Sequence, residues 1–258
     1  MAVFRTRSNT ARVTVIRDQL TEAWHIVVPL RNGPLGPLPS FLVTLTVVTG
    51  LVDAFSYLDL GHVFMANMTG NVVFLAFALA GASGFSVAGS VVALGAFALG
   101  STIGGRTAAV FSERRGRMLR SAASVEAVLV VIAIALSAAS GRDTSGGYRY
   151  GIIVLLGVAM GVQNATARKM AVPDLTTTVL TQTSAGLFAD MKLIGGTGSK
   201  AGRRLVSVLA MFVGAVIGAT LVVHGSKTLA LVVAFLLVAP VALIAGMLSR
   251  GRPSWDRP

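Results

Sequence analysis

The chain has 258 residues, of which 54% are hydrophobic and only 12% are charged, and its mean hydropathy is +0.77. Soluble domains carry about 25% charged residues, so this composition argues against a soluble protein. The absence of cysteine excludes disulfide bonds, thiol catalysis and cysteine-ligated metals. The net charge of +12 does not indicate nucleic-acid binding, because the Lys and Arg residues lie at the ends of apolar blocks, as in loops that face an anionic membrane leaflet.

The first segment, residues 1–38, is basic and ends in a stretch rich in proline and glycine. Two interpretations stay open: residues 10–30 lie on the membrane surface as an amphipathic helix, or the segment is a disordered basic tail that fixes orientation. Eight apolar blocks follow, of about the 17 to 25 residues that cross a bilayer core as a helix. The sequence therefore predicts an all-α, polytopic transmembrane helical bundle. The blocks are residues 40–58, 64–82, 86–110, 122–140, 150–168, 175–191, 204–223 and 228–248.

Blocks 64–82 and 175–191 differ from the others because each opens with polar residues. Lys and Arg residues gather on the cytoplasmic side of membrane proteins, which constrains the number of crossings. If these two blocks enter and leave the membrane on one face, every strongly basic segment falls on the cytoplasmic side. Eight full crossings would instead place the basic loop before block 122–140 outside. Six full spans with both termini in the cytoplasm are therefore favoured, and eight spans stay open because block 64–82 is long enough to cross.

The two halves of the chain resemble each other at three points in the same order. Gly50–Ala54 parallels Gly161–Ala165, Asn67–Thr69 parallels Thr181–Thr183, and Gly100–Gly104 parallels Gly214–Gly218. The separation from Thr69 to Gly100 and from Thr183 to Gly214 is the same, 31 residues. Such spacing indicates an internal duplication.

The duplication predicts a transmembrane domain over residues 39–248, made of repeats 39–141 and 149–248, between the cytoplasmic segment 1–38 and a cytoplasmic tail, residues 249–258. Each half would have three full spans plus one short or re-entrant polar helix, which gives six to eight membrane helices. Because three is odd, the halves would be inverted repeats, a plan that recurs in transporters. Eight spans would make the repeats parallel.

Two paired motifs also relate the chain to a known family. Gly50-Leu-Val-Asp-Ala-Phe-Ser-Tyr57 is followed by Phe64-Met-Ala-Asn-Met-Thr-Gly-Asn71, and Gly161-Val-Gln-Asn-Ala165 is followed by the threonine-rich residues 176–183. Over roughly residues 40 to 248 the chain resembles the YoaK-like family of bacterial membrane proteins, a domain of unknown function. The resemblance implies a multi-span bacterial inner-membrane protein and supplies no substrate. The long basic N-terminal segment departs from the family pattern.

Asp53 is the strongest candidate for a functional residue, because it lies well inside block 40–58. A charged side chain at the centre of a spanning helix costs about 2.5–3.5 kcal/mol on insertion scales, so Asp53 must face the protein interior or a hydrated cavity, or be protonated. There it could bind a proton or cation, or form a hydrogen-bonded contact between helices. Glu126 lies only four residues into block 122–140. We expect it to form an ion pair with Arg120 at the membrane interface.

Neutral polar side chains cluster at matching points of the two halves, where they could replace the hydration shell of a small solute or ion. The alternative is that they form interhelical hydrogen bonds, which average about 0.6 kcal/mol each. We predict a substrate or ion pathway lined by Asp53, Asn67, Thr69, Asn71, Gln163, Asn164, Thr181 and Thr183. Gly100, Gly104, Gly214 and Gly218 are assigned to helix packing, within the chain or between two protomers, because glycines four residues apart let helices approach closely.

The sequence contains no motif for metal binding, nucleotide binding or hydrolysis, and we expect no catalytic residue, no metal and no cofactor. The favoured function is a small secondary transporter or facilitator for a small solute or ion, not an enzyme, in the bacterial inner membrane. The main alternative is a non-transporting scaffold or accessory subunit. A lipid-acting membrane enzyme with Asp53 as its base is less favoured. Membrane lipids are expected partners, nucleic acid is not, and a homo-oligomer stays open.

Overall fold

The structure, a computed structural model, describes residues 35–141, 144–170, 172, 185, 201–225, 227–251 and 253–256, and every regular element in this part of the chain is helical. The prediction of an all-α polytopic bundle is therefore confirmed. The helices are α2 (Leu38–Asp59), α3 (Met68–Leu79), α4 (Val87–Val110), α5 (Arg115–Ala139), α6 (Gly146–Met170), α8 (Ala201–Val223) and α9 (Lys227–Leu248), followed by the 3-10 turn η2 (Ser254–Asp256).

Six of these helices are long and apolar enough to cross a membrane: α2, α4, α5, α6, α8 and α9. They have 22 to 25 residues each, which at 1.5 Å per residue gives lengths of about 33 to 38 Å. Helix α3 has only 12 residues, or about 18 Å, and cannot cross a hydrocarbon core of about 30 Å. Block 64–82 thus contains a short apolar helix, while block 175–191 lies almost wholly outside the described residues.

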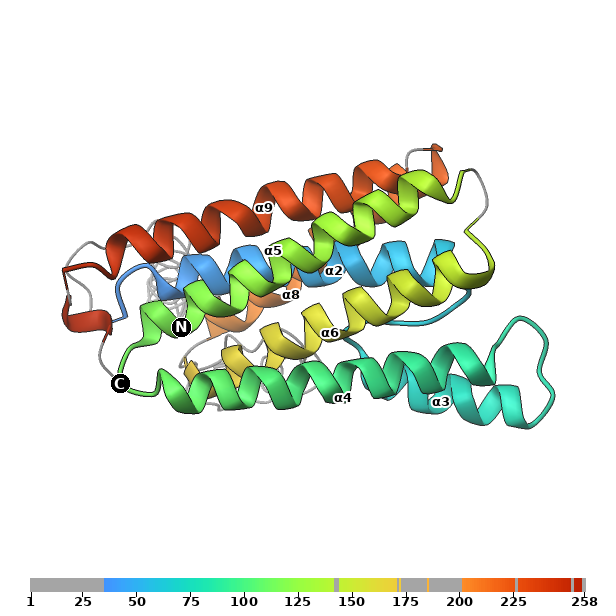
Figure 1. The fold of residues 1–258 in the computed structure, drawn as a ribbon, viewed down its shortest axis with the longest axis horizontal. Coiled ribbons are helices and arrows are strands. Elements are labelled where there is room, and N and C mark those ends of the chain that lie inside the picture. Colours follow the sequence, from blue (N-terminus) through green and yellow to red (C-terminus); the bar gives the residue numbers. More distant parts are fainter. Residues whose placement is uncertain are drawn as a thin grey trace, which may run out of the picture.

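The long helices alternate in direction between the two ends of the bundle (Figure 1). Helices α2, α5 and α8 run from one end to the other, and α4, α6 and α9 run back. Ten of the twelve described Lys and Arg residues lie toward the end where α2 begins, and only Arg149 and Lys227 lie at the other. We call these the basic end and the opposite end. The ten are Arg106, Arg114, Arg115, Arg117, Arg120, Arg168, Lys169, Arg203, Arg204 and Arg250.

Two parallel helix pairs, α2 with α8 and α4 with α6, form the tightest contacts of the bundle. In the first pair, a Cβ added at Gly214 would lie 1.9 Å from the carbonyl oxygen of Val47, and one added at Gly218 would lie 2.6 Å from that of Leu51. No real Cβ approaches an atom so closely. The backbones of α2 and α8 can meet here only because glycine has no side chain.

The second pair, α4 with α6, repeats the same contacts with equivalent residues of the two halves. A Cβ added at Gly100 would lie 2.2 Å from the carbonyl oxygen of Val158, and one added at Gly104 would lie 2.7 Å from that of Val162. Val158 and Val162 each stand 111 residues after Val47 and Leu51, as Gly161 does after Gly50. Each half of the chain therefore contributes one helix to each pair.

Helices α5 and α9 form a third, antiparallel pair on one side of the bundle (Figure 1). The hydroxyls of Ser137 and Thr228 lie 3.0 Å apart near the opposite end, and Gly116 meets Ser249 near the basic end. Large apolar side chains such as Val128, Phe212 and Leu243 point outward, with exposed fractions of 60%, 64% and 68%. Helices that are apolar on their outer faces as well as inside are typical of a bundle whose solvent is lipid.

The short turn η2 fastens the C-terminal segment to the basic end. The Asp256 carboxylate accepts a 2.7 Å hydrogen bond from the Gly116 backbone N–H and a 3.3 Å bond from the Arg114 side chain. It therefore caps the start of α5, where free N–H groups and the helix dipole favour a negative charge. The Trp255 ring is buried against Gly36, just before α2. It therefore joins the segment that follows the last long helix to the segment that precedes the first.

Candidate functional site

The connection between α2 and α3 folds back into the bundle and is fixed there by two polar side chains. Asp53 Oδ1 accepts hydrogen bonds from the backbone N–H groups of Met65 and Ala66, each at 2.8 Å. Asn71 bonds both backbone groups of Phe64: its Oδ1 accepts from the N–H at 2.8 Å, and its Nδ2 donates to the carbonyl at 2.6 Å. Both side chains are buried.

These bonds explain how irregular backbone persists below the end of α2. Asp53 stands six residues before the last residue of α2, which places it about 9 Å along the helix from that end. Backbone N–H and C=O groups at membrane depth persist outside helices only where protein or water satisfies them. Figure 1 shows the connection turning back along the bundle before α3 returns to the same end. Asp53 and Asn71 thus hold a segment that turns back along the bundle in the first half of the chain.

A second polar group lies at the centre of the bundle, where Glu126 of α5 meets Gln163 of α6 and Thr49 of α2. None of these side chains is more than 2% exposed. With its amide nitrogen toward Glu126, Gln163 donates to the two carboxylate oxygens at 2.8 and 3.1 Å, and its oxygen accepts from the Thr49 hydroxyl at 2.8 Å. Three helices therefore converge on one buried carboxyl group.

The opposite orientation of the Gln163 amide also completes a chain of hydrogen bonds. Its nitrogen then donates to Thr49 at 2.8 Å, and the Thr49 hydroxyl donates to the Leu45 carbonyl at 2.9 Å. The amide oxygen would then face Glu126, which is favourable only if that carboxyl is protonated and donates. The first orientation matches an ionised Glu126 and the second a neutral one. When Glu126 is ionised, the Gln163 amide takes the first orientation, because its oxygen would be repelled by the carboxylate in the second.

The expectation that Glu126 forms an interfacial ion pair with Arg120 is wrong. Helix α5 begins at Arg115, seven residues before the predicted block, so Glu126 is the twelfth of its 25 residues and lies at mid-helix. Its side chain is 0% exposed, and no described Lys or Arg pairs with it. The Arg120 side chain instead lies against Gly246 of α9.

The two carboxyl groups belong to one column of buried polar side chains. Thr49 and Asp53 are four residues apart on α2, so they share a face and lie about 6 Å apart along the axis. Thr166 lies three residues after Gln163 on α6 and is also buried. Asp53 Oδ2 and the Thr166 hydroxyl have no hydrogen-bond partner among the described residues. Free polar atoms in such a column could accept a proton, a cation or a solute.

The other residues predicted to line a pathway are placed less deeply or are not described. Asn67 and Thr69 stand at the start of α3 and are exposed. Asn164 is half-buried, and its amide donates to the Met160 carbonyl of its own helix at 2.9 Å. Thr181 and Thr183 lie outside the described residues. The pathway assignment as a whole stays a prediction.

Glu126 and Thr49 are the members of this site that sequence reasoning missed. Glu126 is the only acidic residue of α5, and it falls on the face that also buries Leu119, Ala123, Val130 and Ala133. Their spacing of three to four residues is the helical period, so the pattern could have shown that Glu126 faces the interior. Thr49 offered no comparable signal, because a lone threonine on an apolar helix usually bonds its own backbone.

A separate polar network lies at the opposite end. Lys227, at the start of α9, pairs with Asp59 at the end of α2, with Nζ 3.7 Å from Oδ1. Thr144, between α5 and α6, donates to Asp59 Oδ2 at 2.6 Å and lies 2.5 Å from Lys227 Nζ. The two charged side chains are only 12% and 13% exposed. The network therefore ties three parts of the chain together at this end.

The comparisons with known proteins agree with this architecture. The family described as "Protein of unknown function (DUF1275)" matches residues 41–244, which include both buried carboxyl groups and almost all of the six long helices. The chain belongs to the DUF1275 family. DUF1275 is thus the family of uncharacterised membrane proteins that the paired motifs of Asp53 and Asn71 indicated, and that prediction is confirmed.

One curated relative and one negative result complete the comparison. The DUF1275 chain is 31% identical over 152 residues to the UPF0700 transmembrane protein YoaK of Bacillus subtilis (strain 168). The alignment spans 59% of this chain and 66% of that protein. No solved structure matches the chain. The protein is therefore a multi-pass membrane protein of an uncharacterised family.

Proposed function

We propose that this protein is a small proton-coupled secondary transporter or facilitator for a small polar solute or ion, with Glu126 as the group that takes up and releases the proton. The observation that carries the proposal is the complete burial of Glu126 at the middle of α5, with no described cationic partner. Ionisable side chains at membrane depth are costly and rare, and they mark proton relays and substrate pathways.

The hydrogen bonds around Glu126 support a switch rather than a static contact. A chain of bonds from Glu126 through Gln163 to Thr49 is complete for either protonation state, provided that the Gln163 amide turns over. Protonation would therefore change the bonds between α5, α6 and α2 without leaving any of the three side chains unsatisfied. A proton bound on one side of the membrane could in this way bias how these helices pack.

Asp53 has a positioning role in this proposal. One of its oxygens accepts from the backbone N–H groups of Met65 and Ala66, and the other is buried without a hydrogen-bond partner among the described residues. The re-entrant segment that it fixes leads to the exposed Asn67 and Thr69 at the start of α3. We propose that these residues form the entrance to the pathway, and that Thr181 and Thr183 serve the second half in the same way.

We further propose that the two halves are inverted repeats and that both termini are cytoplasmic. The equivalent glycine contacts of the α2–α8 and α4–α6 pairs support a duplication, and α2 and α6 run in opposite directions. The basic end, where α2 begins and η2 lies, would face the cytoplasm, since Lys and Arg residues are retained there. Inverted halves give the bundle two related arrangements, which is the basis of alternating access in secondary transporters.

The second candidate function, a non-transporting scaffold or accessory subunit, rests on the bonds of Asn71. This side chain is fully committed to the backbone of Phe64, as expected of a packing residue. If Asp53 and Glu126 likewise serve only to join helices, the protein would move no solute. We propose no enzymatic activity and no cofactor in either case.

The proposal is tested with purified protein in liposomes that enclose a pH-sensitive dye. Amino acids, sugars and organic acids are added one at a time under an imposed membrane potential, and internal pH is followed. At least one solute should move protons in the wild type. Glu126→Gln should abolish that movement, because glutamine keeps the shape and hydrogen bonds but cannot exchange a proton. The matched control is Glu113→Gln, which changes an exposed carboxylate before α5 and should transport normally.

A second measurement separates proton binding from transport. Infrared difference spectra between acid and alkaline pH should contain a carboxyl band that disappears in Glu126→Gln and persists in Glu113→Gln. Cysteines placed at Thr69 and Thr183 should react with a membrane-impermeant thiol reagent, since the chain has no native cysteine. Absence of proton movement with every solute, together with protection of both cysteines, would reject the transporter in favour of the scaffold.

A further inference from the structure

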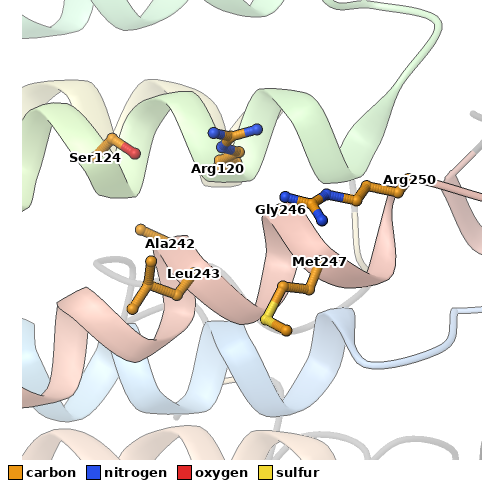
Figure 2. A pocket seen from close by; sticks show the side chains of 7 residues that line it. All are labelled: Arg120, Ser124, Ala242, Leu243, Gly246, Met247 and Arg250. Atoms are coloured by element: carbon orange, nitrogen blue, oxygen red, sulfur yellow. The ribbon is translucent and has the colours of Figure 1, made fainter.

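A cavity of about 150 Å³ lies between α5 and α9 near the basic end, away from the buried carboxyl groups (Figure 2). It opens on the outer side of the bundle, where Leu243 and Met247 are 68% and 66% exposed. In a membrane this surface faces lipid. Its lining combines two arginines with small and apolar side chains: Arg120, Ser124, Ala242, Leu243, Gly246, Met247 and Arg250.

Both arginine side chains lie near Gly246 of α9. The stem of Arg120 crosses α9 at Gly246, where an added Cβ would lie 2.8 Å from Arg120 Cδ and 3.0 Å from its Nε. Glycine at this position therefore leaves the room in which the arginine lies. Figure 2 shows the Arg250 guanidinium extending from just beyond the end of α9 toward Gly246.

The two guanidinium groups share one cavity and have no carboxylate partner among the described residues. At the same end Arg114, by contrast, is paired with Asp256. Two positive charges that line one cavity without a described counter-charge favour an anion in it. Guanidinium groups match phosphate oxygens especially well, because they donate two parallel hydrogen bonds.

The remaining lining identifies the kind of anion. Leu243 and Met247 lie on the last turns of α9, and Arg250 follows two residues after the helix ends, so the lining changes from apolar to charged toward the basic end. A soluble phosphate would meet only the arginines, whereas a phospholipid has a charged group and an acyl chain at the corresponding depths. Basic pockets between transmembrane helices on the cytoplasmic side are known to bind anionic lipid headgroups.

We propose that this cavity binds an anionic phospholipid of the leaflet at the basic end, with its phosphate between Arg120 and Arg250 and an acyl chain along Leu243 and Met247. The site does not depend on the proposed transport function. It gives the lipid a contact with both α5 and α9.

The test is native mass spectrometry of the full chain in mild detergent with dimyristoyl phosphatidylglycerol or dimyristoyl phosphatidylcholine. The two lipids have identical acyl chains and differ in headgroup charge. The first phosphatidylglycerol molecule that binds to the wild-type protein should bind more tightly than the first phosphatidylcholine molecule. Arg120→Ala and Arg250→Ala should each weaken phosphatidylglycerol binding about fivefold, because one arginine near an anionic lipid surface raises the affinity by about that factor. The double variant should weaken binding about 25-fold, the product of the two effects.

Two further variants separate a built site from general attraction to charge. Arg117→Ala removes an exposed arginine from the same helix, outside the cavity, and should leave binding unchanged. Gly246→Val keeps both charges but displaces Arg120, and should weaken phosphatidylglycerol binding as Arg120→Ala does. Thermal unfolding of each lipid-free variant verifies that the fold is retained.

Three results would overturn the proposal. The first is an unchanged preference for phosphatidylglycerol in the Arg120→Ala, Arg250→Ala double variant. The second is an equal loss in Arg117→Ala, which would show attraction without a site. The third is competition by inorganic phosphate as strong as that by the lipid, which would make the ligand a soluble anion.

Discussion

Replacing Gly100 by alanine would place a Cβ atom 2.2 Å from the carbonyl oxygen of Val158, across the contact of α4 with α6. Ordinary contact begins at 3.4 Å, so the two helices must separate locally by about 1.2 Å. Overpacking of this kind costs about 1–3 kcal/mol, while alanine regains about 1 kcal/mol of helix propensity. Gly105→Ala is the matched control, because nothing lies within 4 Å of a Cβ there and only the gain applies.

Unfolding in mild detergent, followed by tryptophan fluorescence, measures the difference. At about 3 °C per kcal/mol for a chain of this size, Gly100→Ala should unfold roughly 3 to 9 °C below Gly105→Ala. Gly214→Ala should behave like Gly100→Ala, since its Cβ would lie 1.9 Å from the Val47 carbonyl. Equal midpoints for Gly100→Ala and Gly105→Ala would show that the helices do not approach as closely as described, and would refute this reasoning.

Three further substitutions probe separate contacts. Asp53→Ala leaves two buried backbone N–H groups without an acceptor, at a cost of about 1–3 kcal/mol each. Hydrogen exchange should therefore accelerate in residues 60–67 and not in α5, and unchanged exchange would show that Asp53 does not hold this segment. Lys227→Ala removes a partly buried ion pair worth about 1 kcal/mol, so its unfolding midpoint should lie below that of the wild type. Salt screens the ion pair, so this difference should shrink at high salt, and a difference independent of salt would contradict an electrostatic role. Asp256→Ala removes the cap of α5 at a cost of about 0.5–2 kcal/mol and should loosen η2, which holds the neighbouring Trp255. With Trp24 replaced by Phe, so that Trp255 alone fluoresces, acrylamide should quench the variant more strongly, and equal quenching would contradict the cap.

The long helices among the described residues followed from hydrophobicity, because a helix that spans lipid must be apolar over about twenty residues. The starts of these helices did not follow so directly. Helix α5 begins with Arg115, Arg117 and Arg120, which a hydropathy criterion assigns to a loop. Basic side chains can continue a helix into the headgroup region, since their long stems reach water from there. The error of seven residues at this end moved Glu126 from the expected interface to the middle of the bundle.

The site was predicted in part for a similar reason. Asp53 and Gln163 were recognised because polar groups deep in apolar blocks must face the interior. The partners of these groups could not be read from the sequence. Asp53 bonds the backbone of Met65 and Ala66, and a backbone N–H leaves no trace in residue type. Gln163 meets Glu126, 37 residues earlier in the chain, through a helix contact that only the packed structure defines.

Each helix pair combines one helix from each half of the chain, and this has a consequence for the order in which the pairs form during synthesis. Gly50 of α2 meets Met211 of α8, which is 161 residues later in the chain, whereas Gly100 of α4 meets Val158 after only 58. At 5 to 20 residues per second, α2 waits in the membrane for roughly 8 to 30 s before its partner leaves the ribosome. During that interval the surface around Gly50 must be covered by lipid, by the nascent α4–α6 pair or by the insertion machinery, whereas Asp53 meets its partners Met65 and Ala66 only 12 and 13 residues later in the chain. Helix α8 then enters against a helix that was inserted first, and α9, which follows it in the chain and packs against α5, enters after it.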